Sequence, residues 1–181
     1  MDQDPPQMGI NVQLNVRPAR DEDEPFLDEL RAELDNERLL FDHAMLEEEE
    51  KKLLLEIQNE AYKRHYENAD WEKMHCIIEF DGKPVGTFIN FYDDEEIRLA
   101  DIVIAKSHRG LGVGFAVIQG VQGEAENSKR PLRLHVEKTN PALQLYEQMG
   151  FRLLEDRGSH LFLEWTPPSL QGKTLYFPGQ G

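Results

Sequence analysis

The sequence predicts a single α/β domain with a mixed β-sheet that carries helices on both faces. Segments in which apolar and polar residues alternate are interspersed with segments in which apolar residues recur every three to four positions. A glycine-rich turn near residue 110 joins a strand pattern to a helix pattern. A chain of 181 residues with 39% hydrophobic residues also suits one domain with a hydrophobic core.

The N-terminal third predicts one strand followed by two helices. Residues 1–9 are polar and contain two prolines, so we expect them to be disordered and the folded domain to span 10–167. Residues 10–17 alternate apolar and polar side chains, which is typical of a half-buried strand. Residues 21–40 and about 42–66 show the apolar spacing of amphipathic helices, and the first has acidic residues in its early turns.

The remaining chain predicts a hairpin, a strand–turn–helix unit and a strand–helix–hairpin unit. The expected elements are one long helix at 112–128 and strands at 75–80, 85–92, 96–105, 132–137, 151–154 and 161–165. A helix of about nine residues is bracketed by Asn140 as N-cap, Pro141 as first helical residue and Gly150 at the C′ position. The tail 168–181 contains glycine and proline, and its pattern leaves open whether it docks on a neighbour, stays mobile or is an added tag.

The glycine turn, residues 110–114, predicts a backbone anion site. Gly110, Gly112 and Gly114 remove side chains where a ligand would approach the main chain, and they leave N–H groups unpaired at a helix N-terminus. These amides and the helix dipole favour phosphate, and Arg109 adds side-chain donors. The spacing matches neither the phosphate-loop motif G-x-x-x-x-G-K nor the dinucleotide fingerprint G-x-G-x-x-G. A tight structural turn that packs a helix closely on a strand is the alternative interpretation.

The net charge of −15 argues against nucleic acid as a partner, because a strongly acidic chain repels a phosphate backbone. The same charge favours a cationic acceptor such as an amine, although an ordinary solvated surface also carries such an excess. It does not oppose a phosphate ligand at the glycine turn, because close amide contacts outweigh distant, screened charges.

Cysteine and histidine usage predicts no metal site. The single cysteine, Cys76, excludes an internal disulfide and a cysteine-clustered metal site, and the six histidines lack H-E-x-x-H spacing. No apolar run approaches about 18 residues and no signal-peptide pattern is present. We therefore expect a soluble, cytoplasmic protein without a membrane partner.

Two motifs together resemble those of the GNAT N-acetyltransferase superfamily. The family signature R-x-x-G-x-G, which holds the pyrophosphate of acyl-CoA, is similar to Arg109-Gly-Leu-Gly-Val-Gly114. The C-terminal motif of the family is similar to N-P-A-x-x-L-Y-x-x-x-G-F at residues 140–151. The order of elements over 10–167 also resembles this fold. Two stretches, Tyr62-Lys-Arg-His-Tyr66 and Leu134-His-Val-Glu-Lys-Thr-Asn140, are similar to those of a branch of uncharacterised bacterial members. The resemblance implies a mostly antiparallel sheet whose central strands splay apart.

The resemblance also implies where acetyl-CoA would bind as co-substrate. Main-chain groups from Ile102 to Ile104 would pair with the pantetheine arm, and an N–H near Ile104 would polarise the thioester carbonyl. Amides of the glycine turn would hold the pyrophosphate, and Asn140 would contact the pantetheine or thiol end unless it acts only as an N-cap. The implied cofactor-binding residues are Ile102, Ile104, Arg109, Gly110, Leu111, Gly112, Val113, Gly114 and Asn140.

The position of Tyr146 in the C-terminal motif implies that it is the general acid that protonates the departing CoA thiolate. A phenol suits this role because it donates a proton without carrying charge into an apolar site. The alternative interpretation is a helix tyrosine that only packs on the sheet.

Asp101 is the candidate general base. An alkyl ammonium group, with a pKa of about 10.4, must lose a proton before its nitrogen can attack. Asp101 interrupts the apolar row of Ile97, Leu99 and Val103, so we expect its carboxylate to be partly buried, with a raised pKa. A water chain is one alternative, and the other candidate side chains are Glu79, Glu96 and His135.

These observations predict a single-domain acyltransferase that moves acetyl from acetyl-CoA to a primary amine of a small molecule or peptide. Direct attack needs no covalent enzyme intermediate, and Cys76 lies outside both motifs. One alternative is a non-catalytic acyl-CoA sensor on the same fold, and another is a protein-interaction module that uses the acidic helices at 21–66. A homodimer is compatible with the resemblance, because dimers are common in that family.

Overall fold

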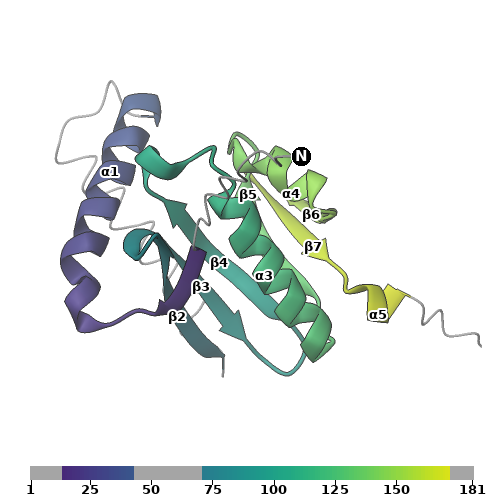
Figure 1. Cartoon of the computed structure of the whole chain (residues 1–181). Coiled ribbons are helices and arrows are strands. Elements are labelled where there is room, and N and C mark those ends of the chain that lie inside the picture. Colours follow the sequence, from purple (N-terminus) through teal and green to yellow (C-terminus); the bar gives the residue numbers. More distant parts are fainter. Residues whose placement is uncertain (1–13, 43–70, 172–181) are drawn as a thin grey trace, which may run out of the picture.

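The structure is a computed structural model that describes residues 14–42 and 71–171 (Figure 1). In chain order its elements are β1 (Leu14–Pro18), the 3-10 helix η1 (Asp21–Asp23), α1 (Glu24–Asp42), β2 (Glu72–Phe80), β3 (Lys83–Tyr92), β4 (Ile97–Ile104), the 3-10 helix η2 (Lys106–His108), α3 (Val113–Ser128), β5 (Leu132–Glu137), α4 (Ala142–Gln148), β6 (Arg152–Arg157), β7 (His160–Trp165) and α5 (Pro168–Gln171). The expected disorder at 1–9, residues 10–13 of the strand expected at 10–17, nearly all of the helix expected at 42–66 and residues 172–181 of the expected tail lie outside the described residues. The first four residues of that tail form the short helix α5, which the sequence pattern did not predict.

Within the described ranges, seven strands form one sheet in the order β1-β2-β3-β4-β5-β7-β6. All neighbours in this order are antiparallel except β4 and β5, which run parallel. A parallel pair needs a crossover connection, and α3 supplies it here. The predicted mixed, mostly antiparallel sheet is confirmed.

Helices cover both faces of this sheet. Cys76 and Ile78 of β2 belong to the core cluster that also contains the buried side of α3. Ile77 between them is fully buried but points to the opposite face, because side chains alternate along a strand. On that side α1 contacts β3 and buries Leu27 and Leu30, whereas α3 contacts β4 and β5. Figure 1 shows α3 across the middle of the sheet and α1 beside its β2–β3 end.

The C-terminal hairpin extends further than the sequence pattern predicts. Its two strands have six residues each, because the turn takes only Gly158 and Ser159. Gly158 has φ +80°, a conformation that glycine adopts without strain, so the chain reverses within two residues. None of the helices in the described ranges is both long enough and apolar enough to cross a membrane.

Candidate active site

The central strands β4 and β5 separate part of the way along their length. They are paired over three residues, from Ile97 opposite Leu132 to Leu99 opposite Leu134. β4 then continues to Ile104 and stays paired with β3 on its other side. Among the described residues, the β5 side of β4 has no strand partner beyond Leu99. The expected splay of the central strands is confirmed.

A β-bulge at Ala100 lies where β4 leaves β5. Ile89 of β3 faces Asp101 while the next residue, Asn90, faces Leu99, so Ala100 is an extra residue in β4. A bulge bends a strand and increases its local twist, which turns β4 away from its parallel neighbour. It also shifts the alternation of side chains along β4 by one position.

The expected partial burial of Asp101 is wrong because of this shift. An unbroken alternation would have placed Asp101 on the same face as Ile97 and Leu99, which contact the core beneath α3. After the bulge that face is taken by Ile102 and Ile104 instead, and Asp101 is exposed. Asp101 still lies close to the point where β4 and β5 separate, two residues after the last paired residue, Leu99.

The open edge of β4 presents main-chain groups of Ile102 and Ile104. The N–H of Ala105 donates to the carbonyl of Val85 in β3, with 2.8 Å between N and O. In an antiparallel ladder successive residues point to opposite sides, so the N–H and C=O of Ile102 and Ile104 point away from β3. Arg109 supports this direction, because its Nε donates to the carbonyl oxygen of Ile104 at 2.8 Å. The two residues expected to meet the pantetheine arm therefore share the edge that β5 leaves.

The glycine turn joins this edge to α3 with its surface open. Gly110 and Gly112 have φ values of +73° and +84°, a region that favours glycine. A Cβ added at either position would meet no heavy atom within 4 Å. Because α3 begins at Val113, the N–H groups of its first turn have no partner inside the helix. Leu111 and Phe115 are exposed beside these amides. A phosphate group fits this arrangement of free donors without side chains.

Two acidic side chains of α1 contact the segment that leads into the glycine turn. Arg109 Nη1 lies 2.8 and 2.9 Å from the carboxylate oxygens of Glu37. The N–H of Lys106 donates to the carboxylate of Glu33, with 3.2 Å from N to each oxygen. Sequence reasoning missed both acids. A spacing of four predicts that they share a helix face, but the segment that this face meets lies 72 or 73 residues further along the chain.

Asn140 caps the N-terminus of α4, as its sequence position predicts. Its Oδ1 accepts a hydrogen bond from the N–H of Ala142 at 2.9 Å, and its C=O accepts one from Leu143 at 3.0 Å. Pro141 already has helical backbone angles, with φ −57° and ψ −25°, so Asn140 is the residue just before the helix. The cap uses the side-chain oxygen of Asn140 and leaves its amide nitrogen outside this hydrogen bond.

The C-terminus of α4 fixes the position of Tyr146. Gly150 has φ +89° and its N–H donates to the carbonyl of Glu147, while the N–H of Phe151 donates to the carbonyl of Tyr146. These two bonds form a Schellman motif around Gly150. The rings of Tyr146 and Phe151 are in edge-to-face contact, with 5.5 Å between centroids. The turn at Gly150 therefore brings the Phe151 ring against the Tyr146 ring.

The phenol of Tyr146 is held in its protonated form. The residue is 6% exposed and belongs to the core cluster. Burial raises the pKa of Tyr146 to about 12, and the negative charge of Asp101 acts in the same direction. At neutral pH the hydroxyl can therefore donate a proton. Packing on the sheet and proton donation, the two interpretations of this residue, are compatible in this geometry.

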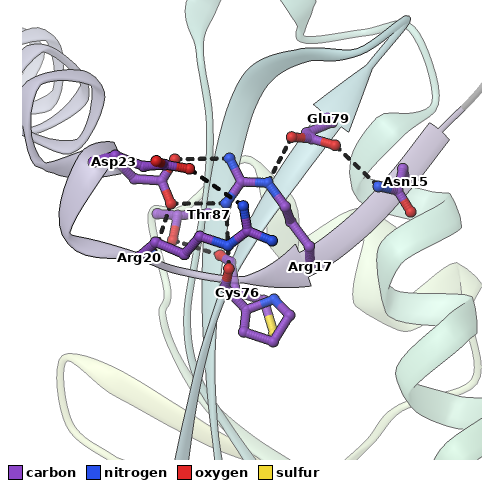
Figure 2. Close-up of polar contacts among 9 residues, drawn as sticks. Asn15, Arg17, Arg20, Asp23, Cys76, Glu79 and Thr87 are labelled. Atoms are coloured by element: carbon purple, nitrogen blue, oxygen red, sulfur yellow. Dashed lines mark hydrogen bonds and ion pairs between the residues drawn. The ribbon is translucent and has the colours of Figure 1, made fainter.

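Glu79 lies in a polar network where β1, β2 and η1 meet (Figure 2). Its carboxylate accepts hydrogen bonds from Asn15 Nδ2 at 2.9 Å and from Arg17 Nε at 2.6 Å. These two bonds lower the pKa of Glu79. Arg17 also donates to both carboxylate oxygens of Asp23, at 2.7 and 2.8 Å. Glu79 is thus an ionised partner of a structural arginine, which disfavours it as a base.

Glu96 and His135 are also engaged by neighbours. Glu96 is 4% exposed and its carboxylate contacts the guanidinium groups of Arg98 and Arg133. The His135 ring stacks on Phe162 with 4.6 Å between centroids. In the part of the chain that the structure describes, no group of three or more His, Cys, Asp or Glu side chains is placed to bind a metal ion.

Comparison with known proteins adds one family model and many solved structures. The model described as "Acetyltransferase (GNAT) family" matches residues 21–151. The PaiA N-acetyltransferase of Thermoplasma acidophilum, solved with coenzyme A, is 16% identical with a TM-score of 0.63, over 85% of this chain and 99% of that one. The ribosomal-protein-S18-alanine N-acetyltransferase of Escherichia coli is 18% identical with a TM-score of 0.59, over 91% and 100%. A GNAT family acetyltransferase of Elizabethkingia anophelis with acetyl-CoA bound is 15% identical with a TM-score of 0.55, over 84% and 97%.

Proposed function

The chain belongs to the GNAT acetyltransferase family, and from that premise we propose that it moves the acetyl group of acetyl-CoA to a primary amine of a small molecule or a peptide. One observation carries this proposal. The open edge of β4 runs directly into the glycine turn, and the buried, protonated Tyr146 lies within the electrostatic reach of Asp101 at the other end of that edge. This arrangement supports the proposal, because it would bring a binding edge, an anion site and a proton donor together around one splayed strand.

The glycine turn and the open edge are the parts proposed to hold acetyl-CoA. The amides of Gly110, Leu111, Gly112, Val113 and Gly114 would bind the pyrophosphate. The main-chain groups of Ile102 and Ile104 would pair with the pantetheine arm as a missing strand would. The amide nitrogen of Asn140 would donate to the same arm, because its oxygen caps α4. The coenzyme A and acetyl-CoA bound to two of the structural neighbours support this assignment.

The proposed chemistry forms a C–N bond and breaks the C–S bond of the thioester. The N–H of Ile104, which points to the open side of β4, would stabilise the negative charge that develops on the carbonyl oxygen. Tyr146 would donate its phenolic proton to the departing sulfur and recover one from solvent. Asp101, directly or through a water, would take the proton that the ammonium group loses.

The acceptor is proposed by class, as a cationic primary amine. The net charge of −15 raises the local concentration of cations near the protein. One structural neighbour is named for acting on an alanine of a ribosomal protein, so a peptide amine is one acceptor to screen beside small polyamines and amino sugars.

The first experiment is isothermal titration of acetyl-CoA into the protein and into Gly112→Glu. We expect micromolar binding by the wild type and its loss in Gly112→Glu, because the new side chain strains a residue at φ +84° and places a carboxylate in the phosphate site. Gly120→Glu is the matched control. It adds the same charge to α3 at an exposed site where a Cβ meets nothing within 4 Å, so binding should persist.

Three outcomes would correct the proposal. If the wild type does not bind acetyl-CoA, the acetyl-CoA-dependent function is wrong. If Gly120→Glu abolishes binding as Gly112→Glu does, the site assignment is wrong. If binding occurs but no amine in the panel releases free thiol, the chain is a sensor of acyl-CoA on the same fold.

A further inference from the structure

Two acidic residues of α1, Glu33 and Glu37, hold the segment that enters the glycine turn. We infer that Glu37 competes with the pyrophosphate of acetyl-CoA for Arg109, and so sets the affinity of the site from a helix outside it; this inference rests on the proposed function. Glu37 engages Arg109 Nη1 with both carboxylate oxygens, at 2.8 and 2.9 Å. Glu33, one helical turn earlier, accepts from the N–H of Lys106.

The contact joins one face of α1 to the short segment 106–109 that precedes the glycine turn. Glu33 and Glu37 are four positions apart, so they lie on the same side of the helix. Their partners, Lys106 and Arg109, are the first residue of η2 and the residue immediately before Gly110. The Glu37 side chain is 26% exposed and the Arg109 side chain 39%, so water screens the pair only in part. Two carboxylates therefore contact the short segment, residues 106–109, that directly precedes the amides proposed to bind an anion.

The sign of the effect follows from a second anchor on Arg109. Its Nε donates to the carbonyl of Ile104 at 2.8 Å, and that carbonyl belongs to a strand held by β3. If the carboxylate of Glu37 is removed, this bond keeps the guanidinium beside the turn. What disappears is the negative charge that pairs with Arg109 and offsets its positive charge. Loss of Glu37 should therefore strengthen cofactor binding rather than weaken it.

The test compares acetyl-CoA affinity of the wild type, Glu37→Gln and Glu29→Gln by isothermal titration in low salt. Glu37→Gln should bind acetyl-CoA about two- to fivefold more tightly. This is the change in binding constant that corresponds to the usual strength of a partly exposed ion pair. Glu29→Gln removes the same charge from an exposed position of α1 two turns before Glu37, and should leave the affinity unchanged. The gain in Glu37→Gln should shrink at about 1 M salt, where charges are screened.

A double-mutant cycle makes the inference specific to Arg109. In the Arg109→Gln background the Glu37→Gln substitution should give no gain, since the group for which Glu37 competes is gone. Equal or weaker binding by Glu37→Gln in the wild-type background would overturn the inference, as would an equal gain in Glu29→Gln. If the wild type itself binds no acetyl-CoA, the proposed function is wrong, and the inference that rests on it is wrong as well.

Discussion

The hydroxyl of Tyr146 is the group on which the proposed chemistry depends most. The ring is fixed by the Schellman motif at Gly150 and by the edge-to-face contact with Phe151. Both features belong to the backbone and the aromatic ring, so neither needs the hydroxyl. This separation allows the acid role to be tested without disturbing the fold.

Tyr146→Phe should lower kcat by about 100-fold or more while the KM for acetyl-CoA and the thermal stability stay near wild-type values, because only the proton donor is lost. Since the pKa of Tyr146 is about 12, the wild-type phenol stays protonated up to about pH 11. The rate between about pH 6 and 10 should then rise with deprotonation of the amine and show no loss from Tyr146. Steady-state kinetics across this range check the prediction, and an unchanged kcat in Tyr146→Phe would contradict the acid role.

At the scale of elements, the C-termini of α3 and α4 each end at one residue with a positive φ angle. α4 ends at Gly150, and α3 ends at Lys129, which has φ +55°. The N–H groups of Lys129 and Arg130 donate to the carbonyls of Glu126 and Ala125, the same pair of bonds that closes α4. Glycine adopts this conformation freely, whereas lysine is strained in it.

Lys129→Gly should stabilise the protein by about 0.5–1 kcal/mol, because relief of the strained φ exceeds the entropy cost of glycine in the unfolded chain. Lys129→Ala is the control, since alanine keeps the strain and should give no gain. Urea unfolding followed by circular dichroism measures both variants. A Lys129→Gly variant no more stable than Lys129→Ala would show that backbone strain at this cap is negligible.

At the scale of the whole molecule, Arg17 ties the first strand to the second strand and to η1, which leads into α1 (Figure 2). Its guanidinium bonds Asp23 with two nitrogens and Glu79 with a third. Asp23 is 5% exposed and also accepts from the N–H of Arg20 at 2.8 Å. The network thus joins segments more than 50 residues apart around one buried carboxylate.

Stability should fall as the pH drops from about 4 toward 2, partly through Asp23. Its hydrogen bonds to Arg17 lower the pKa of Asp23 from 3.8 to about 2. Between these values the unfolded chain binds more protons than the folded chain, so the free energy of unfolding decreases with falling pH. Asp23→Asn should flatten this part of the curve, whereas Asp21→Asn, in the same turn and exposed, should keep it. Unfolding free energies measured at several pH values check this, and an unchanged slope in Asp23→Asn would contradict it.

The sequence alone predicted the order of the seven strands with α1, α3 and α4, the glycine turn and the caps of α4, but not the short helix α5. These features depend on local rules: alternation identifies a strand, and glycine or asparagine marks positions whose backbone or cap other residues fill poorly. The roles assigned to Ile102, Ile104 and Asn140 in binding acetyl-CoA remain predictions, supported by their position at the open edge and the end of α4.

Only the tertiary structure decided the surroundings of Asp101, Glu37 and Glu79. The bulge at Ala100 reversed the alternation that the sequence pattern implied for Asp101, and a bulge is set by pairing with β3, which no local pattern contains. Glu37 meets Arg109 and Glu79 meets Arg17 across 72 and 62 residues. The physical reason is that periodicity determines which face of an element is apolar, whereas the partner of a polar side chain depends on how elements distant in sequence pack together.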